Sequence, residues 1–214
     1  MPRTQPFTVV ALLAAVAGAL ALTSCTTTIQ SESADDAGSA TRSPAAQHVT
    51  GHAVPGHCQG RIGDSSVDEV TVPNGATCEL DGTTVEGNIS VGHGAHLIAR
   101  GVDVDGDLEG EGTASVEVTD GSTIGGNLQL ESGGSVVVRD SHVDGDLSWE
   151  EQRGALTAEH NTIRGNLEAD QNSGGVTVSS NDVGGDLSCE ENDPAPQGGG
   201  NHVSGNTEDQ CRGL

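Results

Sequence analysis

A five-residue pattern of apolar and polar positions recurs at a constant spacing from Val85 to near the C-terminus. Its form is Val or Ile, any residue, Gly, Asn or Asp, then Leu, Ile or Thr, hereafter the repeat phrase. The seven copies begin at Val85, Val104, Ile124, Val143, Ile163, Val183 and Val203. Their glycines follow one another at intervals of 19 or 20 residues. A constant period of this length predicts a solenoid, in which each repeat forms one coil.

Each repeat also carries a second pair of apolar residues, two positions apart, ahead of the next phrase. The pairs are Cys78 and Leu80, Leu97 and Ala99, Val116 and Val118, Val136 and Val138, Leu156 and Ala158, and Val176 and Val178. This spacing is typical of β-strands, and the many Gly, Asp, Asn, Ser and β-branched residues disfavour helices. We therefore predict an all-β fold, a single-stranded parallel β-helix (β-solenoid) of about 7 coils with about 20 residues each.

Two or three short strands per coil are expected, around a thin aliphatic core. Within each phrase, the first apolar residue, the Gly and the Leu are expected to share the inner face of one strand. Apolar residues make up 33% of the chain, and Phe7 and Trp149 are its only aromatic residues. We expect Trp149 to lie in the core, in one column with Val91, Leu130, Ala169 and Cys189.

The charge of the chain excludes one class of partner. There are 32 acidic residues against 8 arginines and no lysine, for a formal net charge of -24. Nucleic-acid binding is excluded because a protein needs cations to neutralise phosphates.

The four cysteines beyond Cys25 fall into two pairs, and the two members of each pair are about one coil apart in the sequence. Equivalent residues of adjacent coils lie about 4.8 Å apart, which fits the Cα separation of a disulfide. We predict disulfides between Cys58 and Cys78 and between Cys189 and Cys211, which would close the two ends of the solenoid. A metal site of four cysteines would need close Cys-x-x-Cys pairs, so we predict no metal ligands.

The fourth position of the phrase alternates strictly between Asn and Asp. The residues are Asn88, Asp107, Asn127, Asp146, Asn166, Asp186 and Asn206. We interpret them as a structural ladder, because alternation separates the carboxylates and lets each Asn amide donate to neighbouring Asp oxygens. A row of calcium ligands is the alternative. Asn161, Asn181 and Asn201 form a second, shorter ladder, which we place at corners because Asn tolerates the left-handed conformation.

The N-terminus predicts export. Residues 1–24 combine a positive charge at Arg3 with an apolar run from residue 7 to residue 22, which is typical of a signal peptide and short for a membrane span. The following Leu22-Thr-Ser-Cys25 resembles the lipobox of bacterial lipoproteins, which implies lipidation of Cys25. Residues 25–55 are then the lipidated cysteine and a flexible linker rich in Ser, Thr and Ala.

The repeats resemble known families. Asn161-Thr-Ile163-Arg-Gly165-Asn166 and Asn201-His-Val203-Ser-Gly205-Asn206 resemble the phrase of right-handed parallel β-helix proteins, the superfamily that includes the pectate lyases. The Gly-[Asn/Asp]-[Leu/Ile] step is similar to that of bactofilins, polymerising bacterial β-helices that lack an export signal. The stretch from Leu187 to Cys211 resembles the C-terminus of secreted proteins and lipoproteins of actinobacteria. These resemblances imply a β-helix domain over residues 56–214, and specify fold more than function.

The sequence offers little for catalysis. The histidines His93, His96, His142, His160 and His202 fall in different coils or turns, and the cations of the repeats are only Arg100, Arg139, Arg153 and Arg164. No Gly-x-Ser-x-Gly, Walker or His-Glu-x-x-His motif is present. We therefore expect a protein that is not an enzyme and needs no cofactor.

The expected function is that of a membrane-anchored extracytoplasmic lipoprotein with a structural or interaction role at the cell surface. Its expected partners are the membrane, through the lipid anchor, and a cationic cell-envelope component or protein. We expect a monomer. The alternative is a polysaccharide-binding or polysaccharide-degrading β-helix protein.

Overall fold

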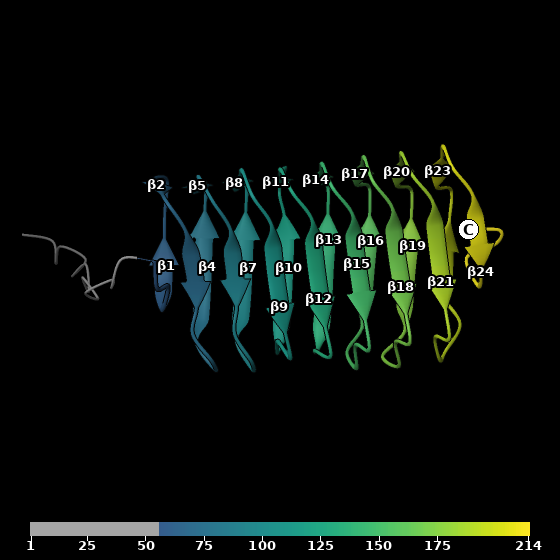
Figure 1. Ribbon diagram of the computed structural model, residues 1–214, viewed down its shortest axis with the longest axis horizontal. Helices are drawn as coiled ribbons and strands as arrows, with labels where there is room; N and C mark the ends of the chain where they lie inside the picture. The colour runs from purple at the N-terminus through teal and green to yellow at the C-terminus, as the bar shows by residue number, and fades with distance from the viewer. Residues whose placement is uncertain (1–55) are drawn as a thin grey trace, which may run out of the picture. The chain divides into compact units, whose positions relative to one another are not determined.

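The computed structural model describes residues 56–214, which form a solenoid of parallel β-strands (Figure 1). The described part is all β, and it contains no helix that could cross a membrane. The predicted signal peptide (1–24), the lipidation site Cys25 and the predicted linker (25–55) lie outside the described residues.

Three parallel sheets of eight strands each run the length of the solenoid, because every coil contributes one strand to each sheet. The first sheet consists of β1 (Gly60–Ile62), β4 (Thr77–Asp81), β7 (His96–Arg100), β10 (Ser115–Thr119), β13 (Ser135–Arg139), β16 (Leu156–Glu159), β19 (Val176–Ser179) and β22 (Gln197–Gly199). The second consists of β2 (Ser66–Val67), β5 (Thr84–Val85), β8 (Asp103–Val104), β11 (Thr123–Ile124), β14 (His142–Val143), β17 (Thr162–Ile163), β20 (Asp182–Val183) and β23 (His202–Val203). The third consists of β3 (Val70–Val72), β6 (Ile89–Val91), β9 (Leu108–Glu111), β12 (Leu128–Glu131), β15 (Leu147–Glu150), β18 (Leu167–Asp170), β21 (Leu187–Glu190) and β24 (Thr207–Asp209).

The predicted parallel β-solenoid is confirmed, with eight coils instead of about seven. The additional coil is the first one, which lacks the repeat phrase. Val67 and Val70 stand there only three positions apart, yet Val67 pairs with Val85 and Val70 pairs with Ile89. The corner between them is one residue shorter than in the later coils, so the five-residue phrase is absent from this coil.

The repeat phrase is a corner between two strands, so the prediction that its Val, Gly and Leu share one face of a single strand was wrong. In the fifth coil, Val143 ends β14 in the second sheet and Leu147 begins β15 in the third sheet. Gly145 lies between them and packs against the backbone of Gly126 in the preceding coil, to whose carbonyl oxygen its N–H donates at 2.9 Å. Glycine is required at this turn because a side chain there would meet the backbone of the preceding coil.

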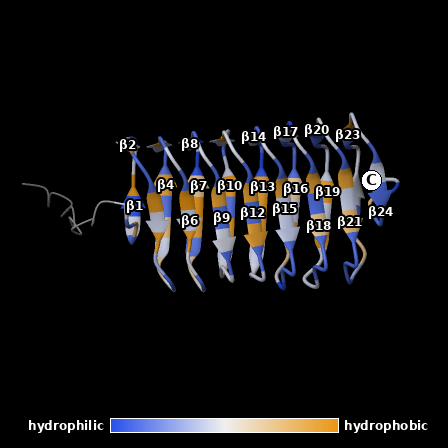
Figure 2. Ribbon diagram, in the orientation of Figure 1, coloured by the Kyte–Doolittle hydropathy of each residue, from blue (hydrophilic) through white to orange (hydrophobic). Residues whose placement is uncertain are grey.

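The core is one continuous cluster of mainly aliphatic side chains between the three sheets. Hydrophobic residues recur on the strands of successive coils (Figure 2). Residues alternate inward and outward along each strand, so each inward residue stacks on its equivalent in the next coil. Trp149 is fully buried, which confirms its predicted place in the core. It stacks between Leu130 and Ala169, and the small side chain of Ala169 leaves space for the indole ring.

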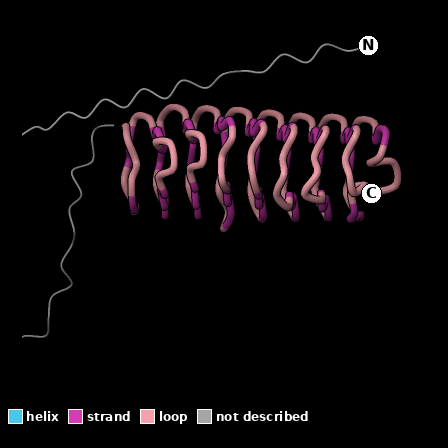
Figure 3. The backbone as a smooth tube through the Cα atoms, turned by 90° about the horizontal axis from the view of Figure 1, so that it is seen from below, coloured by secondary structure: helices cyan, strands magenta, loops and turns pink. Residues whose placement is uncertain are grey.

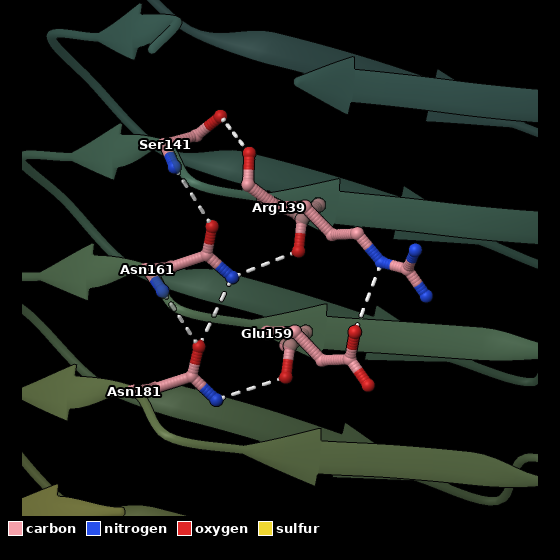
Figure 4. Close-up of polar contacts among 7 residues, drawn as sticks. Arg139, Ser141, Glu159, Asn161 and Asn181 are labelled. Carbon is pink, nitrogen blue, oxygen red and sulfur yellow. Dashed lines mark hydrogen bonds and ion pairs between the residues drawn. The ribbon is translucent and has the colours of Figure 1, made fainter. Parts of the chain in front are cut away.

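Equivalent corners stack from coil to coil along the solenoid (Figure 3), and one row of them joins the first sheet to the second. Asn161 and Asn181 are buried at this corner, as predicted, and their side chains bridge neighbouring coils (Figure 4). Asn161 Nδ2 donates to Val138 O at 2.8 Å and to Asn181 Oδ1 at 3.0 Å, while Asn161 Oδ1 accepts the Ser141 N–H at 3.1 Å. Each side chain therefore joins three successive coils.

The left-handed conformation belongs to the residue before each corner Asn, which corrects the reason given for these asparagines. The φ angles of His160 and Ser180 are 56° and 57°, whereas the corner asparagines have no positive φ. Asn is needed at the corner because its amide offers a donor and an acceptor to buried backbone groups.

Candidate functional site

The Asn and Asp side chains at the fourth position of the repeat phrase, hereafter the phrase ladder, are held by hydrogen bonds from backbone N–H groups. The Oδ1 atom of each ladder side chain accepts the backbone N–H of the next ladder residue, at 2.6 to 2.9 Å, through all six steps from Asn88 to Asn206. The prediction that Asn amides donate to Asp along the ladder was wrong except at its end, where Asn206 Nδ2 donates to Asp186 Oδ1 at 3.2 Å. Asn and Asp serve equally as acceptors, so the ladder's bonding does not depend on their alternation.

The cysteines lie at disulfide distance in the predicted pairs. The Cα atoms are 5.5 Å apart in Cys58–Cys78 and 5.2 Å apart in Cys189–Cys211. Cys58 and Cys78 do not occupy equivalent positions of adjacent coils, however, because Gly60 is the residue in register with Cys78. Cys58 instead donates its N–H to Thr71 O in the third sheet, so its link to Cys78 crosses the interior from the third sheet to the first.

The same arrangement closes the other end. Asp209 is the residue in register with Cys189, and Cys211 lies in the turn that follows β24. Cys211 is fully buried, and Leu214 packs against the core beside it. Both cysteine pairs therefore cover the two ends of the aliphatic core.

An acidic column on the outer face of the third sheet was missed at the level of sequence. It consists of Glu111, Glu131, Glu150, Asp170 and Glu190, which stand in register in five successive coils. Four of the five are exposed, and Asp170 is half-buried. The signal was present in the sequence, since each of these acids is the third residue after the Leu of its phrase.

A neighbouring outward column adds further acids to the same face. Glu109, Glu168 and Glu208 alternate there with Gln and Ser. Stacked carboxylates about 4.8 Å apart repel one another. The backbone hydrogen bonds of the sheet hold them in register in spite of this repulsion.

Two carboxyl groups of this face have raised pKa values. Burial raises the pKa of Glu168 above its ordinary value, and the negative charges of Asp146 and Asp170 raise it further. The pKa of Glu190 is raised by a hydrogen bond with Asp209 and by the charges of Asp209 and Asp170. Both carboxyl groups therefore hold a proton more tightly in the folded chain than in an isolated residue.

The folded protein is expected to become less stable as the pH rises from about 5 to neutral. The raised pKa values of Glu168 and Glu190 stabilise the folded chain fully below their ordinary value of 4.5, and this stabilisation is lost as the pH rises through the raised values. Urea unfolding at a series of pH values measures the effect. The double variant Glu168→Gln, Glu190→Gln should flatten the profile, whereas Glu69→Gln with Glu86→Gln, which changes the net charge equally, should leave the slope as it is. An equal slope in all three proteins would contradict the assignment.

The arginines that form ion pairs lie away from the acidic column. The ion pairs of the described residues are Arg61–Asp81, Arg100–Glu117 and Arg139–Glu159 on the first sheet, and Arg164–Asp144 and His142–Asp144 beside the second (Figure 4 shows Arg139–Glu159). Within residues 56–214, no carboxylate of the acidic column takes part in an ion pair. The third sheet therefore presents uncompensated negative charge.

A shallow hollow of about 360 Å³ opens on this face above Gly110. Gly110 stands in the inward column between Val91 and Leu130, where it contributes no side chain. Glu109, Glu111, Gln129 and Glu131 surround the hollow. A second hollow, of about 300 Å³, is lined by Glu190 and Asp209 at the C-terminal end of the same face.

The histidines do not come together. His96 Nδ1 lies 2.8 Å from Ser115 Oγ on the first sheet, and His142 Nε2 lies 2.7 Å from Asp144 Oδ1 beside the second. Among residues 56–214, no group of three or more His, Cys, Asp or Glu side chains is arranged to hold a metal ion.

Comparison with known proteins finds no family model, no curated protein and no solved structure that matches this chain.

Proposed function

We propose that the protein is a lipid-anchored extracytoplasmic module that uses the outer face of its third sheet to bind a cationic partner at the cell surface. The observation that supports this most is the acidic column, in which five carboxylates repeat in successive coils and form no ion pair with any other residue of 56–214. A rigid sheet fixes the spacing of these charges, so little conformational entropy is lost when a partner binds.

The favoured partner carries several amino or guanidinium groups on one extended segment, as a basic protein tail or an amine-bearing cell-wall component would. Charge complementarity of this kind accelerates association and selects against anionic partners, including nucleic acids. The alternative function of polysaccharide binding or degradation stays a prediction. Trp149 offers no platform for a sugar ring, because it is fully buried.

Lysine homopolymer is the probe that tests the proposed face. We expect it to bind the full chain more weakly as salt increases, and to bind the variant Glu111→Gln, Glu131→Gln, Glu150→Gln, Asp170→Asn, Glu190→Gln at least tenfold more weakly. The Asn at position 170 keeps the oxygen that accepts the Glu190 N–H, so the fold should persist. Isothermal titration calorimetry measures the affinity.

The matched control removes five exposed carboxylates elsewhere, by amide substitution of Asp64, Asp68, Glu69, Glu86 and Asp105. Both variants then have the same net charge. Equal weakening in the two variants would contradict a specific face and leave only non-specific attraction. The anchor is tested in cells by Cys25→Ser, which is expected to move the protein from the membrane fraction to the soluble fraction.

A further inference from the structure

A column of buried corner residues runs between the third and first sheets, and was not recognised in the sequence. Its members in successive coils are Thr113, Gly133, Gln152, Asn172 and Asn192. In its C-terminal half, side-chain amides link the coils. Asn172 Oδ1 accepts the Gln152 N–H at 2.8 Å, and Asn172 Nδ2 donates to Asn192 Oδ1 at 2.9 Å. The Gln210 side chain continues the chain of bonds by accepting from Asn192.

The column is interrupted at Gly133. Gln152 Nε2 donates to Glu150 O, but Gln152 Oε1 has no hydrogen-bond partner. The hydroxyl of Thr113, on the other side of Gly133, has none either. Both residues are almost completely buried, with 0% and 2% of their surface exposed. An unpartnered polar atom in such a place destabilises the folded chain, so these two oxygens require a partner.

Both oxygens lie close to the position where a side chain on Gly133 would begin. A Cβ atom built on Gly133 would lie 2.7 Å from Gln152 Oε1, 2.9 Å from Thr113 Oγ1 and 3.0 Å from Thr113 O. Thr113 Oγ1 and Gln152 Oε1 are therefore within two hydrogen-bond lengths of each other, although they form no direct bond. Glycine is the one residue that leaves this space free of a side chain.

We infer that a buried water molecule binds beside Gly133 and bridges Thr113 Oγ1 to Gln152 Oε1. One water hydrogen is donated to Gln152 Oε1, which can only accept, and the Thr113 hydroxyl accepts from or donates to the same molecule. Water suits the site better than a cation, because the three surrounding oxygens belong to neutral groups. The water continues the polar column across the coil in which no side chain is available, and so holds the third, fourth and fifth coils together.

The substitution Thr113→Val tests this site, because it removes the hydroxyl and keeps the shape of the side chain. If a water bridges the two residues, the variant loses a bonded partner and its melting temperature falls. If the site is dry, the variant loses an unsatisfied buried hydroxyl, and its melting temperature stays the same or rises, which would overturn the inference.

Thr83→Val is the matched control. Thr83 is as completely buried as Thr113, but its hydroxyl has a partner in the protein, because it donates to Gly63 O at 2.9 Å. We expect both variants to melt at a lower temperature than the original protein. A crystal structure at a resolution that reveals ordered solvent gives the direct measurement, with a density peak within hydrogen-bond distance of both oxygens expected. The absence of that peak would also overturn the inference.

Discussion

Replacement of Gly145 by alanine is expected to lower the free energy of unfolding by about 3 kcal/mol. A Cβ atom at this position would lie 2.7 Å from Gly126 O, and closer still to Asn127 Oδ1. The second of these oxygens accepts the Asp146 N–H at 2.9 Å, so the methyl group would displace a rung of the phrase ladder as well as the backbone of the preceding coil. Urea unfolding followed by circular dichroism measures the loss.

Gly63→Ala is the control for this prediction. No atom lies within 4 Å of a Cβ atom built on Gly63, and neither glycine has a positive φ. We therefore expect Gly63→Ala to leave the stability nearly unchanged, or to raise it slightly through the unfolded state. Similar losses in the two variants would show that contact with the preceding coil is not the reason for glycine in the repeat phrase.

Loss of both cysteine links is expected to lower the free energy of unfolding by about 6 kcal/mol, roughly 3 kcal/mol for each closed loop. The links join residues 20 and 22 positions apart, and each one crosses an end of the core. Two double variants separate the contributions of the links. One combines Cys58→Ala with Cys78→Ala, and the other combines Cys189→Ala with Cys211→Ala. Chemical unfolding of each variant, compared with the original chain, gives the difference.

Reduction of the original protein is the second route to the same measurement, because it breaks the links without a change of side-chain volume. Alkylation followed by mass spectrometry identifies the thiols that are released. If the unfolding midpoint stays constant while all four thiols become alkylated, the ends of the core do not depend on these links.

The periodicity of the sequence was sufficient to predict the β-solenoid, because the same glycine recurs in every coil from the second onward and an apolar pair recurs in the second to the seventh coils. It could not reveal the first coil, in which Val67 and Val70 are separated by a shorter corner. Nor could it reveal that the phrase bends. Alternation along Val143, Gly145 and Leu147 fits one strand as well as two strands joined at a corner, and only the packing of Gly145 on the preceding coil decides between them.

The outer surface was harder to predict than the core. The acidic column follows from register alone, yet it becomes visible only when the residues are aligned by coil, since Glu111 and Glu131 are far apart in the sequence. The sequence also could not show that the cysteine links cross the interior between two sheets. A spacing of about one coil is compatible with equivalent positions and also with a crossing of the interior, and the position of Gly60 opposite Cys78 distinguishes them.

The two ladders point in opposite directions along the solenoid axis. In the phrase ladder, the N–H of Asp107 donates back to Asn88, whereas at the corner the N–H of Asn161 donates forward to Asn181. In the phrase ladder, each coil from the third to the seventh donates to the coil before it and accepts from the coil after it. Addition or deletion of a whole unit within this range would keep the phrase ladder continuous, and each added unit would place one more residue in the register of the acidic column. Under the proposed function, the number of carboxylates that face the cationic partner, and with it the avidity, would change in single steps.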